Sequence, residues 1–241
     1  MVTLTIDGQR VQAEEGTTLL EAARDHNIYI PTLCVNEAVS PYGACRLCLV
    51  EVTKKERQRL VASCLYFVEE GLIVRTDSER IALIRGMIIE LLLARCPKAG
   101  EVQELAKRLG VRESRFRVED ENNLCVLCAL CTRVCQEVVG QSAISLVNRG
   151  TDREVAIPFY DNSDACIACG SCAYICPTEA IKLEDVGDTR IITMPNCRLE
   201  FKLKQCPKCG TYWAPEKQLE YMVKKANISS KVFDLCPDCR E

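Results

Sequence analysis

Apolar and polar residues alternate near the start of the chain in the way that predicts a β-hairpin followed by a helix. The dipeptide Asp7-Gly8 favours a tight turn after the first strand, and Thr17 or Thr18 is a suitable N-cap for the helix. Over residues 1 to 76 we expect strands at Val2–Ile6, Arg10–Ala13, Leu49–Thr53 and Leu72–Arg75, and a helix that ends near Asp25. The pattern therefore predicts a small domain in which several strands share a core with one helix.

A helical period replaces this alternation between residues 77 and 118. Thr76-Asp77-Ser78-Glu79 has the form of a capping box, and apolar residues then recur at helical spacing from Ile81 to Leu91. Cys96-Pro97 ends this helix, and a second helix is expected over Glu101–Leu109, before Gly110. The segment is thus predicted to be a helical bridge.

The second half of the chain is again predicted to contain strands. Two strand-like stretches, Ala143–Asn148 and Glu154–Phe159, are joined by a polar turn and predict an inserted hairpin. Near the end of the chain, Pro215–Ala226 reads as a helix. We therefore expect an α+β chain with four parts, at residues 1–76, 77–118, 119–195 and 196–241.

Composition narrows the class of protein. The chain has 241 residues, of which 48% are hydrophobic, so it can bury a core, and 18 are cysteines. Neither a signal peptide nor an apolar run long enough to span a membrane is visible, so we expect a cytoplasmic protein whose thiols are reduced, with no membrane insertion. The net charge is −3 and no long basic run occurs, so nucleic acid is not an expected partner.

Eight cysteines between residues 125 and 176 form two runs with the spacing C-x2-C-x2-C-x3-C. Bacterial ferredoxins hold two [4Fe–4S] clusters with such runs, and the fourth cysteine of each run ligates the other cluster. The expected ligand sets are Cys125, Cys128, Cys131 and Cys176 for one cluster, and Cys135, Cys166, Cys169 and Cys172 for the second. Structural zinc sites or disulfides are the alternative, but zinc sites usually pair two short knuckles.

Four further cysteines near the end of the chain form two C-P-x-C knuckles, at Cys206 and Cys209 and at Cys236 and Cys239. Two such knuckles paired across space commonly make a tetrahedral zinc site, which is the first interpretation here. A further iron–sulfur cluster is the competing interpretation, and Cys197 nearby has no assigned role. The expected role of Trp213 and Tyr221 is local packing.

The first 76 residues, with two hairpins, one helix and four cysteines, resemble the β-grasp [2Fe–2S] ferredoxin fold. Plant-type ferredoxins begin with C-x4-C, whereas here residues 35 to 44 separate the first two cysteines. This longer loop is similar to a variant in the large iron–sulfur subunit of respiratory complex I, in [FeFe]-hydrogenases and in diaphorase subunits of NAD-linked hydrogenases, electron-bifurcating relatives included. The resemblance implies one [2Fe–2S] cluster, where four buried structural thiols are the alternative. Its ligands would be Cys34, Cys45, Cys48 and Cys64.

The resemblance extends over roughly residues 1 to 195, with one departure. In the complex I family, we expect the helical bridge to hold another [4Fe–4S] cluster, with one histidine and three cysteines as ligands. Here only Cys96 remains, because Leu92 and Ala99 stand where ligands would be. One ligand cannot hold a cluster, so this site is interpreted as lost, with Cys96 a packed remnant rather than a redox-reactive thiol.

Three clusters without a dinucleotide fingerprint, a P-loop or a nucleophile–histidine pair indicate electron transfer rather than catalysis. The resemblance implies an iron–sulfur subunit of a soluble, multi-subunit NAD(P)-linked oxidoreductase of hydrogenase, formate dehydrogenase or flavin-bifurcating transhydrogenase type. Its partners would be a flavin- and NAD(P)H-binding subunit, a small [2Fe–2S] thioredoxin-like subunit, and ferredoxin or a catalytic subunit. [FeFe]-hydrogenases continue after this point into a domain that holds the catalytic H-cluster. We therefore expect any H-cluster that works with this chain to lie on another polypeptide. The alternatives are an iron–sulfur redox-sensing or binding protein, and a self-sufficient catalyst.

Overall fold

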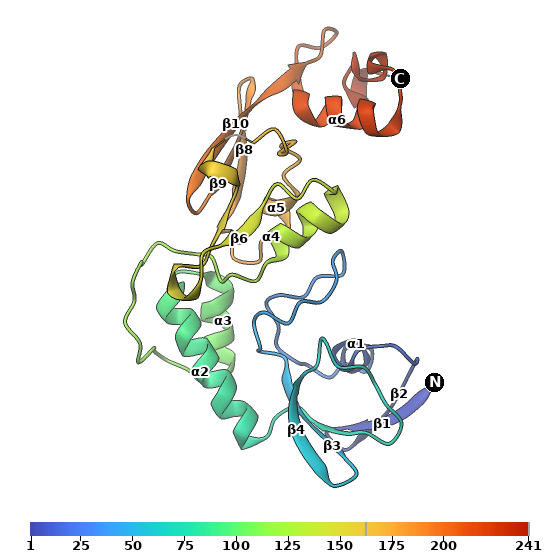
Figure 1. Cartoon of the computed structure of the whole chain (residues 1–241), viewed down its shortest axis with the longest axis vertical. Coiled ribbons are helices and arrows are strands. Elements are labelled where there is room, and N and C mark those ends of the chain that lie inside the picture. Colours follow the sequence, from blue (N-terminus) through green and yellow to red (C-terminus); the bar gives the residue numbers. More distant parts are fainter. Residues whose placement is uncertain (162, 241) are drawn as a thin grey trace. The chain divides into compact units, whose positions relative to one another are not determined.

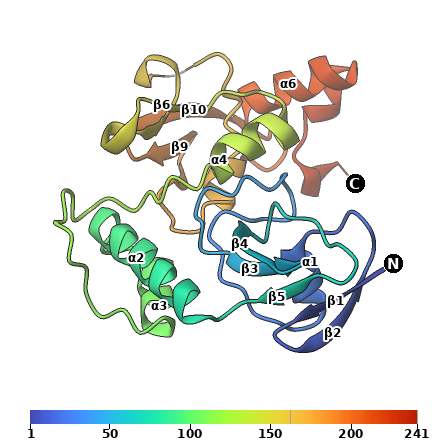
Figure 2. The same cartoon turned by 60° about the horizontal axis from the view of Figure 1, so that its bottom comes forward.

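The computed structural model describes residues 1–161 and 163–240, which fall into two compact units, Met1–Ala129 and Leu130–Glu241. Figures 1 and 2 show the elements of each unit in two views. Within the described residues, the first unit contains a five-stranded sheet, and the second contains a four-stranded sheet and a two-stranded hairpin. No helix among these residues is long and apolar enough to cross a bilayer. The predicted α+β fold class, with ferredoxin-type domains, is confirmed.

The five-stranded sheet of the first unit has the order β2-β1-β5-β3-β4. Its central pair, β1 and β5, is parallel, and the other neighbours are antiparallel. The strands are β1 Val2–Ile6, β2 Gln9–Ala13, β3 Leu49–Lys54, β4 Arg57–Ala62 and β5 Ile73–Arg75. The strands expected from the alternation are therefore confirmed, with bounds shifted by one residue at most.

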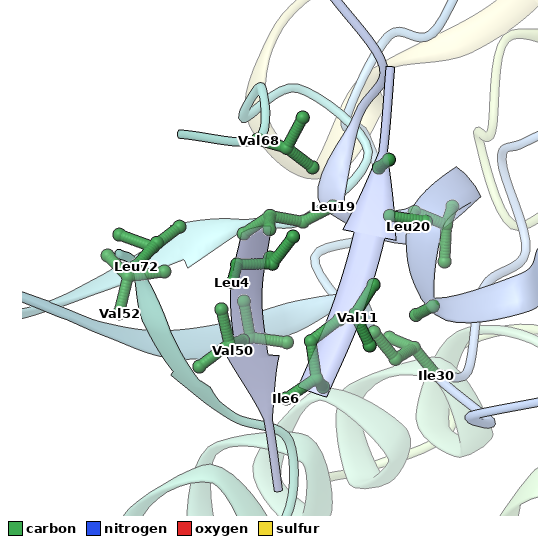
Figure 3. Packing of buried hydrophobic residues seen from close by; sticks show 14 of the residues in the cluster. Leu4, Ile6, Val11, Leu19, Leu20, Ile30, Val50, Val52, Val68 and Leu72 are labelled. Atoms are coloured by element: carbon green, nitrogen blue, oxygen red, sulfur yellow. The ribbon is translucent and has the colours of Figure 1, made fainter. Parts of the chain in front are cut away.

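One face of this sheet packs against the helix α1, Leu19–Asp25, and forms a hydrophobic core of the first unit. Leu4 and Ile6 of β1 and Val50 and Val52 of β3 are fully buried, because alternate residues of a strand point to the same face. They share one cluster with residues from α1 (Figure 3). The helix begins with a complete capping box between Thr18 and Glu21, so Thr18 is the cap.

The expected helical bridge consists of α2, Glu79–Arg95, and α3, Gly100–Arg108. The prediction that Thr76 begins the capping box was wrong, because Ser78 is the N-cap and its hydroxyl accepts from the backbone N–H of Ile81 at 3.3 Å. Thr76 instead donates its backbone N–H and its hydroxyl to the carboxylate of Asp7, at 2.7 and 2.5 Å. Asp7 thereby joins the first hairpin turn to the start of α2.

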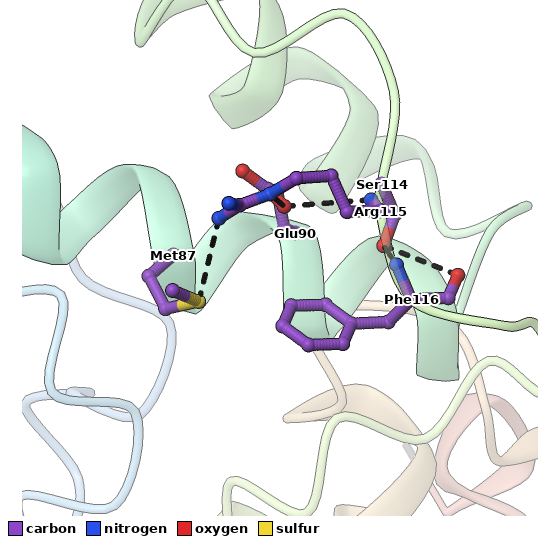
Figure 4. A network of polar contacts seen from close by, with 5 residues as sticks. All are labelled: Met87, Glu90, Ser114, Arg115 and Phe116. Atoms are coloured by element: carbon purple, nitrogen blue, oxygen red, sulfur yellow. Dashed lines mark hydrogen bonds and ion pairs between the residues drawn. The ribbon is translucent and has the colours of Figure 1, made fainter.

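The segment after α3 runs along α2 without regular structure. In Figure 4 the side chain of Arg115 lies beside α2, where its Nε donates to the carboxylate of Glu90 at 2.6 Å. The same guanidinium contacts the sulfur of Met87 at 3.8 Å, and the backbone N–H of Phe116 donates to the Ser114 hydroxyl at 3.0 Å. The contacts of Arg115 with α2 anchor the segment that leads into Cys125.

The second unit begins with α4, Leu130–Arg133, which continues as a π-helix over Val134–Val139. The inserted hairpin predicted from the sequence is present as β6, Ser145–Val147, and β7, Glu154–Ala156. The short helix α5, Ser171–Tyr174, follows. Short 3₁₀ turns lie at Gly150–Asp152 and Pro158–Tyr160.

The four-stranded sheet of the second unit was not predicted. Its order is β11-β10-β9-β8, and all neighbours are antiparallel. It consists of β8 Lys182–Val186, β9 Thr189–Met194, β10 Cys197–Gln205 and β11 Tyr212–Pro215, followed by α6 Glu216–Ala226 and 3₁₀ turns at Ser230–Phe233 and Pro237–Cys239. The boundary expected between residues 195 and 196 falls in the turn between β9 and β10, so these strands connect the ferredoxin part to the last cysteines.

Candidate metal centres

The four cysteines expected to hold a [2Fe–2S] cluster lie together in the first unit. Cys34, Cys45 and Cys48 belong to the long connection between α1 and β3, and Cys64 follows β4. Their sulfurs form two close pairs, Cys34 with Cys45 and Cys48 with Cys64, each with a separation of 3.4 Å. Two pairs of thiolates, one pair for each iron, are the donor set that a two-iron cluster requires.

The backbone around these sulfurs is arranged to donate hydrogen bonds to them. The N–H of Leu33 points at the sulfur of Cys45, and the N–H of Cys45 points at the sulfur of Cys34, each at 3.5 Å. Gly43 has a φ of +69°, which few side chains tolerate, so glycine lets the chain turn tightly before Cys45. Such N–H···S bonds offset the negative charge of a thiolate cluster.

A buried arginine that no sequence motif singles out holds the same loop. Arg85 of α2 is 6% exposed, and its guanidinium donates to the carbonyl oxygens of Leu47 and Leu49, both at 2.8 Å. It also donates to the carbonyl of Thr76 at 2.9 Å. Leu47 and Leu49 flank Cys48, so Arg85 fixes the backbone on both sides of this cysteine and places a positive charge beside it.

The proximity of the thiols changes their acidity. The hydrogen bond with Cys64 lowers the pKa of Cys48 to about 6, and the same bond raises the pKa of Cys64 above its ordinary value. The hydrogen bond with Cys34 raises the pKa of Cys45 in the same way. Thiols gathered this closely ionise together only when cations lie among them, so the site fits a metal cluster.

The cysteines assigned to the second [4Fe–4S] cluster surround one cavity in the second unit. Cys135 comes from the π-helix, and Cys166, Cys169 and Cys172 come from the loop that ends in α5. All four line the cavity, together with apolar residues such as Ala143, Ile144, Ile167 and Ile192. The backbone N–H of Ala143 donates to the sulfur of Cys135 at 3.3 Å. Burial raises the pKa of Cys172 to about 12, so this thiol also requires cations to ionise near neutral pH.

The four-stranded sheet supports the loop that carries these cysteines. Arg190 of β9 forms a two-pronged ion pair with Asp185 of β8, with both distances 2.8 Å, and its third nitrogen donates to the carbonyl of Ala168 at 3.2 Å. Gly170 has a φ of +78°, and a Cβ there would lie 2.3 Å from a methyl carbon of Leu183 in β8. The sheet therefore sets the path of the loop at the two residues that flank Cys169.

The first four-cysteine run has the same local backbone as the second. Leu127 and Ala129, which flank Cys128, have φ values of 53° and 62°, and Ala168 and Gly170, which flank Cys169, have values of 59° and 78°. Left-handed conformations at a leucine and at alanines are strained and concentrate at functional sites. Cys125 and Cys128 lie at the end of the first unit, and Cys131 and Cys176 lie in the second.

In the helical bridge, Cys96 is the cysteine that remains of the expected additional cluster site. Cys96 is completely buried between α2 and α3, among Ile89, Ala99 and Val102, and burial raises its pKa to about 12. A buried thiol of this kind is a poor nucleophile. The surroundings of Cys96 therefore fit the packed remnant that was expected.

The last four cysteines form a compact group at the end of the second unit. The sulfurs of Cys206, Cys209, Cys236 and Cys239 all lie within 4.8 Å of one another, and those of Cys209 and Cys236 are 3.7 Å apart. The backbone N–H of Cys236 donates to the sulfur of Cys206 at 3.5 Å, which lowers the pKa of Cys206 to about 6. Four convergent thiols with an acidic member are suited to a metal ion.

These features define a class of protein, and comparisons with known families support it. Residues 1–79 match the family of 2Fe-2S iron–sulfur cluster binding domains, and residues 124–180 match the 4Fe-4S dicluster domain. The two matches include the cysteines from Cys34 to Cys64 and from Cys125 to Cys176. The chain therefore contains a 2Fe-2S iron–sulfur cluster binding domain and a 4Fe-4S dicluster domain.

The curated relatives are subunits of NAD(P)-linked oxidoreductases, as the resemblance implied. The chain is 31% identical to a subunit of an NADH-quinone oxidoreductase of Rhizobium meliloti, over 88% of this chain and 27% of the relative. It is 37% identical to the alpha subunit of the NADPH-Fe(3+) oxidoreductase of Geobacter sulfurreducens, over 74% of this chain and 24% of the relative. It is 36% identical to the HndD subunit of the NADP-reducing hydrogenase of Solidesulfovibrio fructosivorans, over 75% and 36%. The chain thus spans between 24% and 36% of the length of these relatives.

A solved structure points to the same group of proteins. A chain in the crystal structure of an NAD⁺-reducing [NiFe]-hydrogenase in the H₂-reduced state matches with a TM-score of 0.58 and 29% identity. The match covers 65% of this chain and 74% of that chain. The resemblance inferred from the cysteine spacings is therefore confirmed by sequence and by structure.

Proposed function

We propose that this protein is a non-catalytic electron-transfer subunit with three iron–sulfur clusters. Cys34, Cys45, Cys48 and Cys64 would hold one [2Fe–2S] cluster, and the two expected sets from Cys125 to Cys176 would hold two [4Fe–4S] clusters. The observation that carries the proposal is the pairing of the four N-terminal sulfurs at 3.4 Å, within the matched 2Fe-2S domain. The cavity lined by Cys135, Cys166, Cys169 and Cys172 supports it for the second [4Fe–4S] cluster.

When bound, such clusters supply one-electron redox chemistry. The chain's own residues would fix the position of each cluster and adjust its potential. The N–H groups of Leu33, Cys45 and Ala143 donate to ligand sulfurs, and Arg85 places a buried positive charge near Cys48. Each of these groups favours the more negative, reduced state of a neighbouring cluster and so raises its potential.

For the whole complex, we propose a cytoplasmic NAD(P)-linked oxidoreductase of hydrogenase, formate dehydrogenase or flavin-bifurcating transhydrogenase type. The partners would be a flavin- and NAD(P)H-binding subunit, a small [2Fe–2S] thioredoxin-like subunit, and ferredoxin or a catalytic subunit. The names of the relatives support this level of assignment, because they include an NADH-quinone oxidoreductase and an NADP-reducing hydrogenase. Identification of the subunits that co-purify with the protein from its native cell tests the proposal.

We also propose four domains. They are a [2Fe–2S] domain at residues 1–76, a helical bridge at 77–118, a two-[4Fe–4S] domain at 119–195 and a metal-binding piece at 196–241. We propose zinc for the last four cysteines, and a further iron–sulfur cluster is the competing assignment.

The decisive experiment is an anaerobic preparation of the full chain. We expect about ten irons and ten acid-labile sulfides per chain, two from the [2Fe–2S] and eight from the [4Fe–4S] clusters, with EPR signals of both cluster types after reduction. Cys48→Ser should lower the iron content by about two, whereas the matched control Cys96→Ser should leave it unchanged. About four irons in the reconstituted wild type would contradict the proposal.

A further inference from the structure

The sulfur positions at the end of the chain distinguish between the two kinds of centre considered for it. In a tetrahedral zinc site with Zn–S bonds of about 2.3 Å, neighbouring sulfurs are about 3.8 Å apart. The sulfurs of Cys209 and Cys236 are 3.7 Å apart, and all four sulfurs lie within 4.8 Å of one another. In a [4Fe–4S] cluster each thiolate binds a different iron, so the thiolates lie farther from one another. The geometry therefore fits a single metal ion.

The segment that carries these cysteines has little core of its own. Between Cys206 and Arg240, the buried apolar side chains include Leu219 of α6 and Phe233, together with Cys206 and Cys236 themselves. The Trp213 ring lies 6.4 Å from that of Phe233. Segments with so small a core usually depend on a metal ion for most of their folding free energy.

The helix between the two knuckles contacts both backbone segments that carry ligands of the second [4Fe–4S] cluster. The Tyr221 hydroxyl donates to the carbonyl of Val139, the last residue of the π-helix that contains Cys135, at 3.0 Å. The Lys217 ammonium lies 3.4 Å from the carbonyl of Ser163 and from the carboxylate of Asp164. The N–H of Cys166 donates to that same Ser163 carbonyl at 3.1 Å.

We propose that Cys206, Cys209, Cys236 and Cys239 bind one zinc ion that has no redox role and that holds α6 against the segments carrying Cys135 and Cys166. Zinc at the end of β10 closes the chain into a loop that returns through β11 and α6 to the second knuckle. The ion thereby stabilises the second [4Fe–4S] cluster without contacting it. The stabilising role depends on the proposed function, whereas zinc binding does not.

The first test uses Cys209→Ser in the full chain, because Cys209 is the exposed member of the group and its replacement disturbs no packed core. Wild-type protein should contain about one zinc per chain, and the variant should lose it. The variant should also release about four of its ten irons to a chelator much faster than the wild type, with the [2Fe–2S] signal unchanged. Cys197→Ser, in the same sheet but outside the group, is the matched control and should keep both metals.

The second test removes a contact of α6 and leaves the zinc ligands intact. Tyr221→Phe should retain zinc and should lose iron from the second cluster about fivefold faster, which corresponds to one net hydrogen bond. Bound iron in place of zinc, or full zinc in Cys209→Ser, would overturn the assignment of the site. Zinc loss without any change in the release of iron would overturn the stabilising role. A wild type that binds zinc but no iron would contradict the proposed function, and with it the stabilising role, but would leave the zinc assignment standing.

Discussion

The cysteines of the N-terminal domain and those at the end of the chain show two ways of building a metal site. Around Cys34 to Cys64, the sheet and α1 bury a large apolar cluster, and Arg85 of α2 holds the ligand loop. Around Cys206 to Cys239, few apolar side chains are buried, and the buried residues include the cysteines Cys206 and Cys236. In the first region the fold positions the sulfurs, whereas in the second region we expect a bound metal ion to supply most of the stability of the fold.

We expect the largest effect when zinc is removed from the last four cysteines. Removal of zinc with a strong chelator should expose the amides of α6 to hydrogen exchange, with rates rising more than about a hundredfold, because the local structure loses its main source of stability. Amides of β1 and β3 in the first unit should exchange as before. Exchange followed by mass spectrometry with peptide resolution measures both. Protection of α6 that survives the loss of zinc would mean that its small core suffices.

The matching test of the first region is Arg85→Met, which keeps an unbranched apolar side chain but removes the guanidinium and its donors. Three carbonyl oxygens then lose their partner, and we expect a loss of about 3 kcal/mol of unfolding free energy. Loss of the buried positive charge should also lower the potential of the [2Fe–2S] cluster, because the reduced state is the more negative one. Denaturant unfolding and redox titration measure the two effects. Arg80→Met, at an exposed position of the same helix, should change neither.

Arg85 also marks the limit of what the sequence predicts in the first unit. The cysteine spacings and the alternation of β1 and β2 predicted the ferredoxin-type domain because both are local patterns. Helix α2 is apolar on most of its surface, so the spacing of its apolar residues did not show which face of the helix is buried. Ile81, Arg85 and Ile89 are buried, whereas Leu91 of the expected stripe is half exposed. Which face is buried depends on the carbonyls around Cys48, and these come from a distant part of the chain.

The four-stranded sheet was missed for two different reasons. The strand β10 alternates clearly, with Leu199, Phe201 and Leu203 buried and polar residues between them, so its signal was present in the sequence. The strand β8 is exposed along its whole length and carries no such signal. Its formation depends on pairing with β9. The support that Arg190 gives to the cluster loop could not be predicted without this sheet.

A substitution with an expected effect of intermediate size tests the proposed second [4Fe–4S] site, whose loop contacts this sheet. Gly170→Ala forces a left-handed alanine, at about 1 kcal/mol, and displaces the Leu183 side chain. We expect faster loss of iron from the second cluster. Gly187→Ala is the matched control, since its φ is +60° but no atom lies within 4 Å of the added methyl. It should lower stability by a similar amount without affecting iron release. Equal iron loss in both variants would mean that the sheet does not set the path of the loop.

The smallest expected effect concerns the ion pair that positions Arg190. The hydrogen bond from Arg190 lowers the pKa of Asp185 below its ordinary value, so the pair contributes stability above the unfolded pKa, near 4. This contribution is lost as the pH falls through the lower, folded pKa. Asp185 is 40% exposed and solvent screens the pair, so Asp185→Asn should reduce stability by only about 0.5 kcal/mol at neutral pH. The difference between wild type and variant in denaturant unfolding should be constant from pH 8 to about pH 5, and should shrink below about pH 4 and in high salt. A difference that persists unchanged in acid would show that the charge of Asp185 is not the source of the stability that the pair contributes.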